Sequence, residues 1–177
     1  MTRKEYRETL AFELYKGKSP SLFRRFRVKH LQPNTNCMYL ARKMWYLYEA
    51  GGLRRKLSKL YYLRIVHRFG CCIYANISVG KGFYIAHPVG IVIGKCSIGD
   101  NFTVYQNASI GVRHPGDEQL GRIPKIGNDV RLCTGSAILG DISVADHVTI
   151  GANSLVIKTI GQAGTYAGSP VRRIGNT

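Results

Sequence analysis

The side chains best suited to chemistry in this sequence are five histidines and five cysteines. An imidazole titrates near neutral pH and can take a proton from a hydroxyl group, so each histidine is a candidate general base. The cysteines are odd in number and show no Cys-x-x-Cys spacing, which argues against a disulfide framework and against a zinc site. We therefore expect reduced thiols and no bound metal.

Position along the chain separates the histidines. His30 and His67 fall in a region with helical spacing, and His147 occupies a turn position where other repeats carry Asn or Asp. The remaining two are His87, in the segment His-Pro-Val-Gly-Ile-Val, and His114, in a polar loop rich in Gly and Pro. These two are the candidates for chemistry, and the elements around them must position them.

The first part of the chain is basic and helical. Residues 1–70 contain 17 Lys or Arg against 4 Asp or Glu, so they carry most of the net charge of +16. Tyr6, Leu10 and Leu14 recur every four residues, as on one face of a helix, and Gly51-Gly52 precedes another helical stretch. We expect a basic α-helical N-terminal domain over residues 1–70.

The second part of the chain repeats with a period of six. Thirteen aliphatic anchors follow this period, with phase breaks after Ile91 and after Ile110: Ile73, Val79, Ile85, Ile91, Ile98, Val104, Ile110, Ile126, Leu132, Ile138, Val144, Ile150 and Val156. A six-residue period fits neither a helix nor a simple alternating strand, whereas a short strand and a turn per hexapeptide form a β-helix. The sequence therefore predicts a mainly β fold after the helices.

Three segments carry a resemblance to a known family: IAHPVGIVIGKCSIGDNFTVYQNASIG, PKIGNDVRLCTGSAILGDISVADHVTIGANSLVIKTI and YAGSPVRRI. They resemble the left-handed β-helix, or hexapeptide-repeat, acyltransferases, and within them the serine acetyltransferase-like branch that includes polysaccharide O-acetyltransferases. The resemblance implies a left-handed parallel β-helix of four to five turns over residues 71–164, interrupted by a loop at 112–125 and followed by a C-terminal tail at 165–177. It also implies a homotrimer that uses acetyl-CoA in grooves between neighbouring prisms.

The same resemblance assigns roles to individual residues. His87 is the expected general base. His114 is expected to contact the acceptor or assist catalysis, although Arg113-His114-Pro115 stands early in the loop and Arg122-Ile123-Pro124 occupies the later place. The residues expected to bind acetyl-CoA are Thr134, Ala152, Ile157, Lys158 and Arg172.

Two departures from the serine-specific pattern bear on the acceptor. Cys72 stands fifteen residues before His87, and Ala86 directly before it, where serine-specific members carry Asp. In those relatives the first Asp fixes the other nitrogen of the histidine, and the second holds the ammonium group of the amino acid. Without the second carboxylate an amino acid acceptor would lose a charge-assisted bond. We therefore predict transfer to a sugar hydroxyl of a bacterial surface polysaccharide (capsule, exopolysaccharide or lipopolysaccharide) or its lipid-linked precursor. The alternatives are serine O-acetylation and a non-catalytic β-helix scaffold.

The basic N-terminal region leaves two alternatives open. Its cations, Trp45 and Leu-rich stripes could rest on anionic lipid headgroups. Alternatively, Met44, Trp45, Leu57 and Leu60 pack against the prism or a partner helix. No nucleic-acid reading motif accompanies the charge, so nucleic acid is not an expected partner. With no apolar run for a membrane span or a secretory signal, we expect a cytoplasmic protein, with peripheral contact at the inner membrane under the first alternative.

Overall fold

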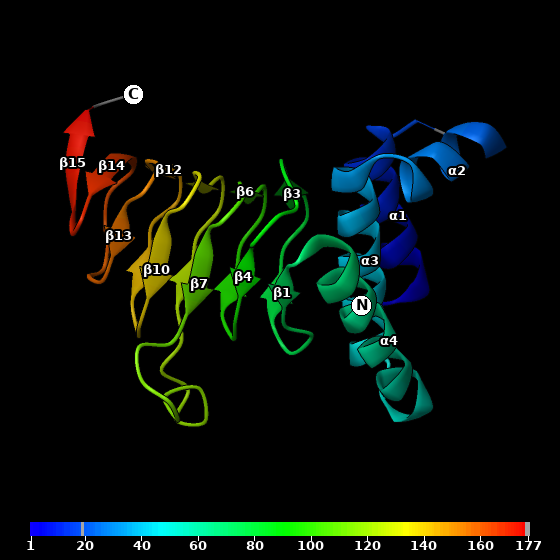
Figure 1. Ribbon diagram of the computed structural model, residues 1–177, viewed down its shortest axis with the longest axis horizontal. Coiled ribbons are helices and arrows are strands. Elements are labelled where there is room, and N and C mark those ends of the chain that lie inside the picture. The colour runs from blue at the N-terminus through cyan, green and yellow to red at the C-terminus, as the bar shows by residue number, and fades with distance from the viewer. Residues whose placement is uncertain (19, 176–177) are drawn as a thin grey trace.

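The computed structural model describes residues 1–18 and 20–175. Over these residues the chain forms four helices followed by fifteen strands. The helices gather at one end of a column of stacked strands, and the C-terminal strands lie at the other end (Figure 1). The predicted helical N-terminal region and β-helix are both confirmed.

The four helices have identifiable start and stop signals. α1 (Arg3–Tyr15) begins with a capping box between Thr2 and Glu5, and α2 (Leu22–His30) is capped by the Ser21 side chain. α3 (Pro33–Glu49) starts with a proline, and α4 (Gly52–Phe69) ends at Gly70, which adopts a left-handed conformation. α3 is the central helix, because it contacts α1, α2 and α4 and also β3.

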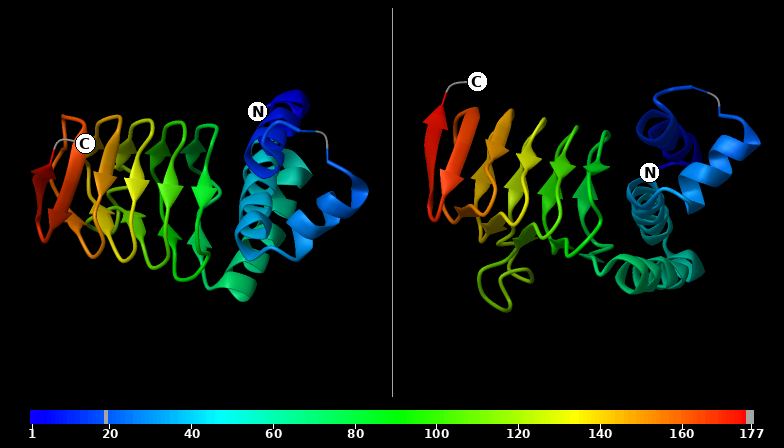
Figure 2. Two further views of the ribbon diagram at one scale, coloured as in Figure 1. Left: turned by 90° about the horizontal axis from the view of Figure 1, so that it is seen from above. Right: turned by 45° about the horizontal axis from the view of Figure 1, so that its top comes forward.

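The strands form three parallel sheets that the chain visits in turn, so that each circuit adds one coil to a prism (Figures 1 and 2). The first sheet contains β1 (Cys72–Ile73), β4 (Val92–Ile93), β7 (Ser109–Gly111), β10 (Ala137–Leu139) and β13 (Leu155–Val156). The second contains β2 (Ser78–Val79), β5 (Ser97–Ile98), β8 (Lys125–Ile126) and β11 (Ser143–Val144). The third contains β3 (Tyr84–Ile85), β6 (Thr103–Val104), β9 (Arg131–Leu132), β12 (Val148–Ile150), β14 (Gly164–Gly168) and β15 (Val171–Gly175).

The anchor side chains fill the interior of this prism. Twelve of the thirteen predicted anchors are at most 5% exposed, and Val79, in the first coil, is half-buried. Parallel pairing places equivalent anchors above one another, as in the pairs Ile110↔Ile138 and Ile138↔Val156. Burial of one aliphatic side chain per hexapeptide is therefore what holds successive coils together.

One predicted anchor is wrong in register. Ile93, not Ile91, pairs with Ile73 on one side and Ile110 on the other, while the carbonyl of Ile91 accepts a hydrogen bond from Cys72. Eight residues separate Ile85 from Ile93, whereas six separate the equivalent residues Val104 and Ile110 of the next coil. The two additional residues lie in the turn that contains His87, so this turn is longer than those stacked on it.

A buried ion pair joins the helices to the first coil. The Glu13 and Arg42 side chains are 0% and 2% exposed, and the Arg42 Nε donates to Glu13 Oε2 at 2.9 Å. Arg42 Nη1 also donates to the carbonyl of Val79 at 3.2 Å, and the N–H of Phe83 donates to Glu13 Oε1 at 2.9 Å. Burial raises the pKa of Glu13, and the bonds from Arg42 and Phe83 oppose this shift.

The apolar residues singled out in the helical region divide between two environments. Met44 and Trp45 are buried, and Trp45 packs against the first coil, because its indole N–H donates to the carbonyl of Tyr74 at 2.9 Å. Leu57 and Leu60, on α4, are 43% and 52% exposed. α3 therefore packs against the prism, whereas the outer face of α4, with Leu57 and Leu60, stays exposed.

The last coil ends in a hairpin. β14 continues the third sheet in parallel with β12, and β15 returns antiparallel to β14. The sequence boundary at residue 165 falls within β14, so the described residues of the predicted tail, 165–175, extend the third sheet.

Candidate active site

One edge of the prism collects three of the predicted site residues. It consists of the turns from the third sheet to the first, which are stacked by hydrogen bonds from Asn107 to Val89 (2.9 Å), Gly135 to Gln106 (3.1 Å) and Asn153 to Thr134 (2.8 Å). His87 lies in the first of these turns, Thr134 in the third and Ala152 in the fourth. We call this the His87 edge. Coils are ~4.8 Å apart, so the three residues form a column ~14 Å long.

His87 itself is exposed on this edge. Its carbonyl accepts from the Val89 N–H at 2.9 Å, and its ring lies 6.5 Å from the Tyr105 ring, centroid to centroid, at 55°. Within the described part of one chain, no hydrogen bond holds the imidazole. Burial and the nearby Cys72 raise the pKa of the Tyr62 hydroxyl, and Cys72 makes no hydrogen bond to His87 in the described part of the chain.

Glycines and left-handed turns let successive coils of the His87 edge stack closely. Gly90 and Gly135 have φ values of 64° and 69°, and Asn107 and Asn153 adopt similar values in the other coils. A Cβ on Gly135 would lie 2.2 Å from the Asn153 Oδ1, so a larger residue does not fit there. The glycines therefore leave room for the asparagine side chains of the next coil.

His114 lies on a different edge. The loop leaves β7 and returns to β8 at the edge between the first and second sheets, which we call the loop edge, and it projects from the column (Figure 1). The exposed His114 donates its backbone N–H to Asp117 Oδ2 at 3.0 Å, and Lys95 Nζ donates to the Glu118 carbonyl at 3.1 Å. The loop covers 112–124, because Lys125 already belongs to β8.

Three of the predicted cofactor-binding residues also lie away from His87. Ile157 and Lys158 follow β13 on the loop edge, where Arg113 Nη2 donates to the Ile157 carbonyl at 2.8 Å. Arg172 is exposed on β15, opposite Ala167. The Nη2 of its neighbour Arg173 donates a hydrogen bond to the Ala163 carbonyl at 3.0 Å. A single chain thus brings His87 together with Thr134 and Ala152, but not with His114, Ile157, Lys158 or Arg172.

Sequence reasoning missed two residues of the His87 edge. Tyr105 places its ring beside His87, and Gln106 lies between the levels of His87 and Thr134. In the described part of the chain the Gln106 Oε1 is buried without a hydrogen-bond partner. The signal was present in the repeat, because Gln106 follows the anchor Val104 by two residues, as Thr134 follows Leu132.

Among residues 1–18 and 20–175, no three His, Cys, Asp or Glu side chains lie close enough together to hold a metal ion.

Three parallel sheets, a six-residue repeat and a projecting loop define the left-handed hexapeptide-repeat β-helix fold. Solved structures of serine acetyltransferases share it together with the helical region. The enzyme from Brucella abortus strain S19 superposes with a TM-score of 0.82 and 26% identity, over 99% of this chain and 71% of that one. A serine acetyltransferase in complex with CoA gives a TM-score of 0.78 and 23% identity, over 97% of this chain and 70% of that one.

Sequence comparison finds the same class of protein. The serine acetyltransferase of Staphylococcus epidermidis strain RP62A is 40% identical over 116 residues, which cover 61% of this chain and 54% of the relative. That of Staphylococcus aureus strain Mu50 is 39% identical over 102 residues, which cover 57% of this chain and 47% of the relative. The chain thus spans about half the length of the curated relatives it matches. No protein-family model matches the chain.

Proposed function

We propose that this protein is an acyl-CoA-dependent O-acetyltransferase with acetyl-CoA as the donor. The stack of His87, Thr134 and Ala152 on one edge of a fold shared with a CoA-bound serine acetyltransferase carries the proposal. The sequence similarity to serine acetyltransferases supports it independently. In this proposal the pantetheine arm of CoA runs along the His87 edge past the half-buried Thr134 and the exposed Ala152.

In this proposal His87 is the general base. Its neutral imidazole takes the proton of the acceptor hydroxyl while the oxygen attacks the thioester carbonyl. Collapse of the tetrahedral intermediate breaks the carbon–sulfur bond, and the imidazolium returns its proton to the departing thiolate. The acetyl group passes directly to the acceptor in a ternary complex, without an acyl-enzyme.

A homotrimer would complete this site. His87 and His114 lie on different edges, separated by the width of the first sheet. Prisms packed side by side around a three-fold axis would place the loop edge of one chain against the His87 edge of the next. His114, Ile157 and Lys158 would then face the same groove as His87, and Lys158 and Arg172 could meet the phosphates of CoA.

Two acceptors have support. L-Serine is the acceptor named for the relatives, and we propose it first. A sugar hydroxyl of a surface polysaccharide or of its lipid-linked precursor is favoured by a specific observation. Between residues 14 and 99 the sequence has one carboxylate side chain, Glu49, and this is paired with the N-terminal amine at 2.6 Å. This segment therefore offers no carboxylate beside His87 for the ammonium group of serine.

Thiol release from acetyl-CoA tests the function and the acceptor together. We expect release that depends on an added hydroxyl acceptor, with L-serine and neutral oligosaccharides assayed in parallel at equal concentration. Faster release with serine would establish the activity of the relatives, and faster release with a sugar would establish the second candidate. If thiol release stayed at the acceptor-independent background in both assays, the proposal would be contradicted, and a non-catalytic scaffold would be the remaining alternative.

We further propose that the helical end makes peripheral contact with anionic lipid at the inner membrane, which would place the protein on the cytoplasmic side. Leu22 and Phe23 on α2 are 83% and 72% exposed and precede Arg24 and Arg25. The α4 helix likewise exposes Leu53 next to Arg54 and lacks acidic residues. Within the described residues, no helix is long and apolar enough to cross a membrane. Exposed apolar side chains between cations are typical of a helix that lies on a lipid surface.

Flotation with liposomes checks this contact. The protein should float with vesicles that contain anionic lipid at low salt and should be released at high salt, because screening weakens the attraction. Replacement of Phe23 and Phe26 by serine should reduce flotation. The matched control is Val89→Ser, which alters an apolar residue on the prism that is 59% exposed. Absence of flotation at low salt would contradict the contact.

A further inference from the structure

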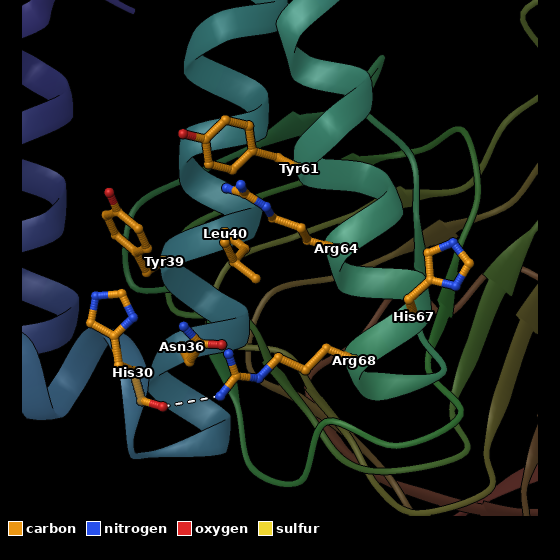
Figure 3. Close-up of a pocket in the computed structure, with 8 residues that line it drawn as sticks. All are labelled: His30, Asn36, Tyr39, Leu40, Tyr61, Arg64, His67 and Arg68. Atoms are coloured by element: carbon orange, nitrogen blue, oxygen red, sulfur yellow. Dashed lines mark hydrogen bonds between the residues drawn. The ribbon is translucent and has the colours of Figure 1, made fainter.

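A cationic cleft opens between the end of α2, the start of α3 and the second half of α4 (Figure 3). Its volume is about 560 Å³, and its lining residues are His30, Asn36, Tyr39, Leu40, Tyr61, Arg64, His67 and Arg68. Arg64 and Arg68 extend from α4 toward α3, whereas the His67 ring points away on the far side of α4 (Figure 3). The cleft belongs to the helical region, so it is separate from the His87 edge.

Among the residues that the structure describes, no carboxylate side chain lines this cleft. Glu49, the one acidic residue between positions 14 and 99, stands thirteen residues after Asn36 on α3. At 1.5 Å per residue this is a distance of about 20 Å along the helix. Glu49 is moreover paired with the N-terminal amine at 2.6 Å. The two guanidinium groups therefore share a cleft whose walls supply no counter-charge.

The two arginines are held in position. They are one helical turn apart on the same face of α4. Arg68 Nη2 donates to the His30 carbonyl at 3.0 Å, which uses one of the five N–H groups of the guanidinium. The Arg64 guanidinium lies over the Tyr61 ring, 5.5 Å from its centroid. Burial and the neighbouring Tyr61 raise the pKa of Tyr39.

We propose that this cleft binds a phosphoryl group of a larger ligand through Arg64, with Arg68 at the other end of the cleft (Figure 3). Guanidinium groups match the oxygens of a phosphoryl group in geometry and charge. The volume exceeds that of phosphate alone and lies in the range of organic ligands, and Tyr39, Tyr61 and Leu40 supply apolar surface. The phosphoryl group therefore belongs to a larger molecule, either a soluble phosphate ester or diphosphate, or a phospholipid headgroup. This site does not depend on the proposed acetyl transfer.

The test compares Arg64→Gln with Arg131→Gln, which removes the same charge from an exposed residue on β9 of the prism. In the soluble arm, inorganic pyrophosphate is titrated by calorimetry in the presence of saturating CoA, so that the CoA site is not measured. In the vesicle arm, cosedimentation is measured with phosphatidylcholine vesicles that either contain or lack phosphatidic acid. Arg64→Gln should weaken binding by ~10-fold or more, and Arg131→Gln by no more than about 2-fold. Thermal unfolding of each variant shows whether it is folded.

Each outcome is decisive. A selective loss for Arg64→Gln with pyrophosphate supports a soluble phosphate ligand. A selective loss with phosphatidic acid alone supports a lipid headgroup as the source. Equal effects of the two substitutions in both arms would show attraction to net charge rather than a site, and would overturn the proposal. Absence of binding by the unmodified protein in both arms would overturn it as well.

Discussion

The His87→Ala variant is expected to lose at least ~10²-fold in kcat for acetyl transfer while its thermal unfolding temperature stays unchanged. The loss follows because the variant has no group at this position that can take the proton from the acceptor hydroxyl. Stability should be unaffected because the imidazole is exposed and holds no hydrogen bond within the described chain. Thiol release under saturating acetyl-CoA and acceptor measures the effect directly.

His147→Ala is the matched control. This histidine is also in a turn of the prism, its side chain is 69% exposed, and its Nδ1 lies 3.6 Å from Asp129 Oδ2. It stands at the edge between the second and third sheets, where no predicted site residue lies. Its removal should leave kcat nearly unchanged. Full activity of His87→Ala, or an equal loss in both variants, would refute the assignment of the base.

The second large effect concerns stability. Arg42→Met should lower the free energy of unfolding by ~3–5 kcal/mol, because it leaves the buried Glu13 carboxylate without its cation. The Val79 carbonyl would also lose its hydrogen bond from the guanidinium. Since these bonds link α1 and α3 to the first coil, the helical region should separate from the prism more readily. Urea unfolding followed by circular dichroism measures the loss.

Two further variants make this result specific. Arg122→Met removes the surface pair with Asp117, whose atoms are 3.8 Å apart, and it should cost no more than about 1 kcal/mol because Arg122 is 60% exposed. Adding Glu13→Leu to Arg42→Met should recover part of the stability, since an apolar pair of similar volume needs no counter-charge. If Arg42→Met unfolded like Arg122→Met, the ion pair would have no structural role.

The sequence predicts the prism well because the physical requirement is simple. Each hexapeptide must bury one aliphatic side chain, and the thirteen aliphatic anchors recur in the sequence with that period. The helical region was predictable from the spacing of Tyr6, Leu10 and Leu14 and from the glycines that separate the helices. Fold class was therefore available from periodicity, and the resemblance to acyltransferases added the hand of the β-helix.

The arrangement of the site was harder to predict, for two physical reasons. Ile91 and Ile93 are both buried, so either could serve as an anchor, and only strand pairing shows that the additional residues lie in the His87 turn. The edge on which a residue lies depends on this register. Second, the resemblance places the site between neighbouring prisms, so it groups His114 and Lys158 with His87 across two chains. In one chain these two residues lie on the loop edge, and the grouping stays a prediction.

The Arg42–Glu13 pair was not foreseen for another reason. The two residues are separated by 29 positions, and both stand among charged residues of helices that expose most of their cations. No local pattern distinguishes a buried arginine from a solvated one. Its role becomes visible only when α1, α3 and the first coil are seen together.

A structure of the protein with bound CoA tests the central claim most directly. The account predicts that the CoA sulfur lies beside His87, within about 4 Å of its ring nitrogens or one water away, with the pantetheine running past Thr134 and Ala152. A CoA whose thiol end lies on another edge of the prism, far from this imidazole, would contradict it.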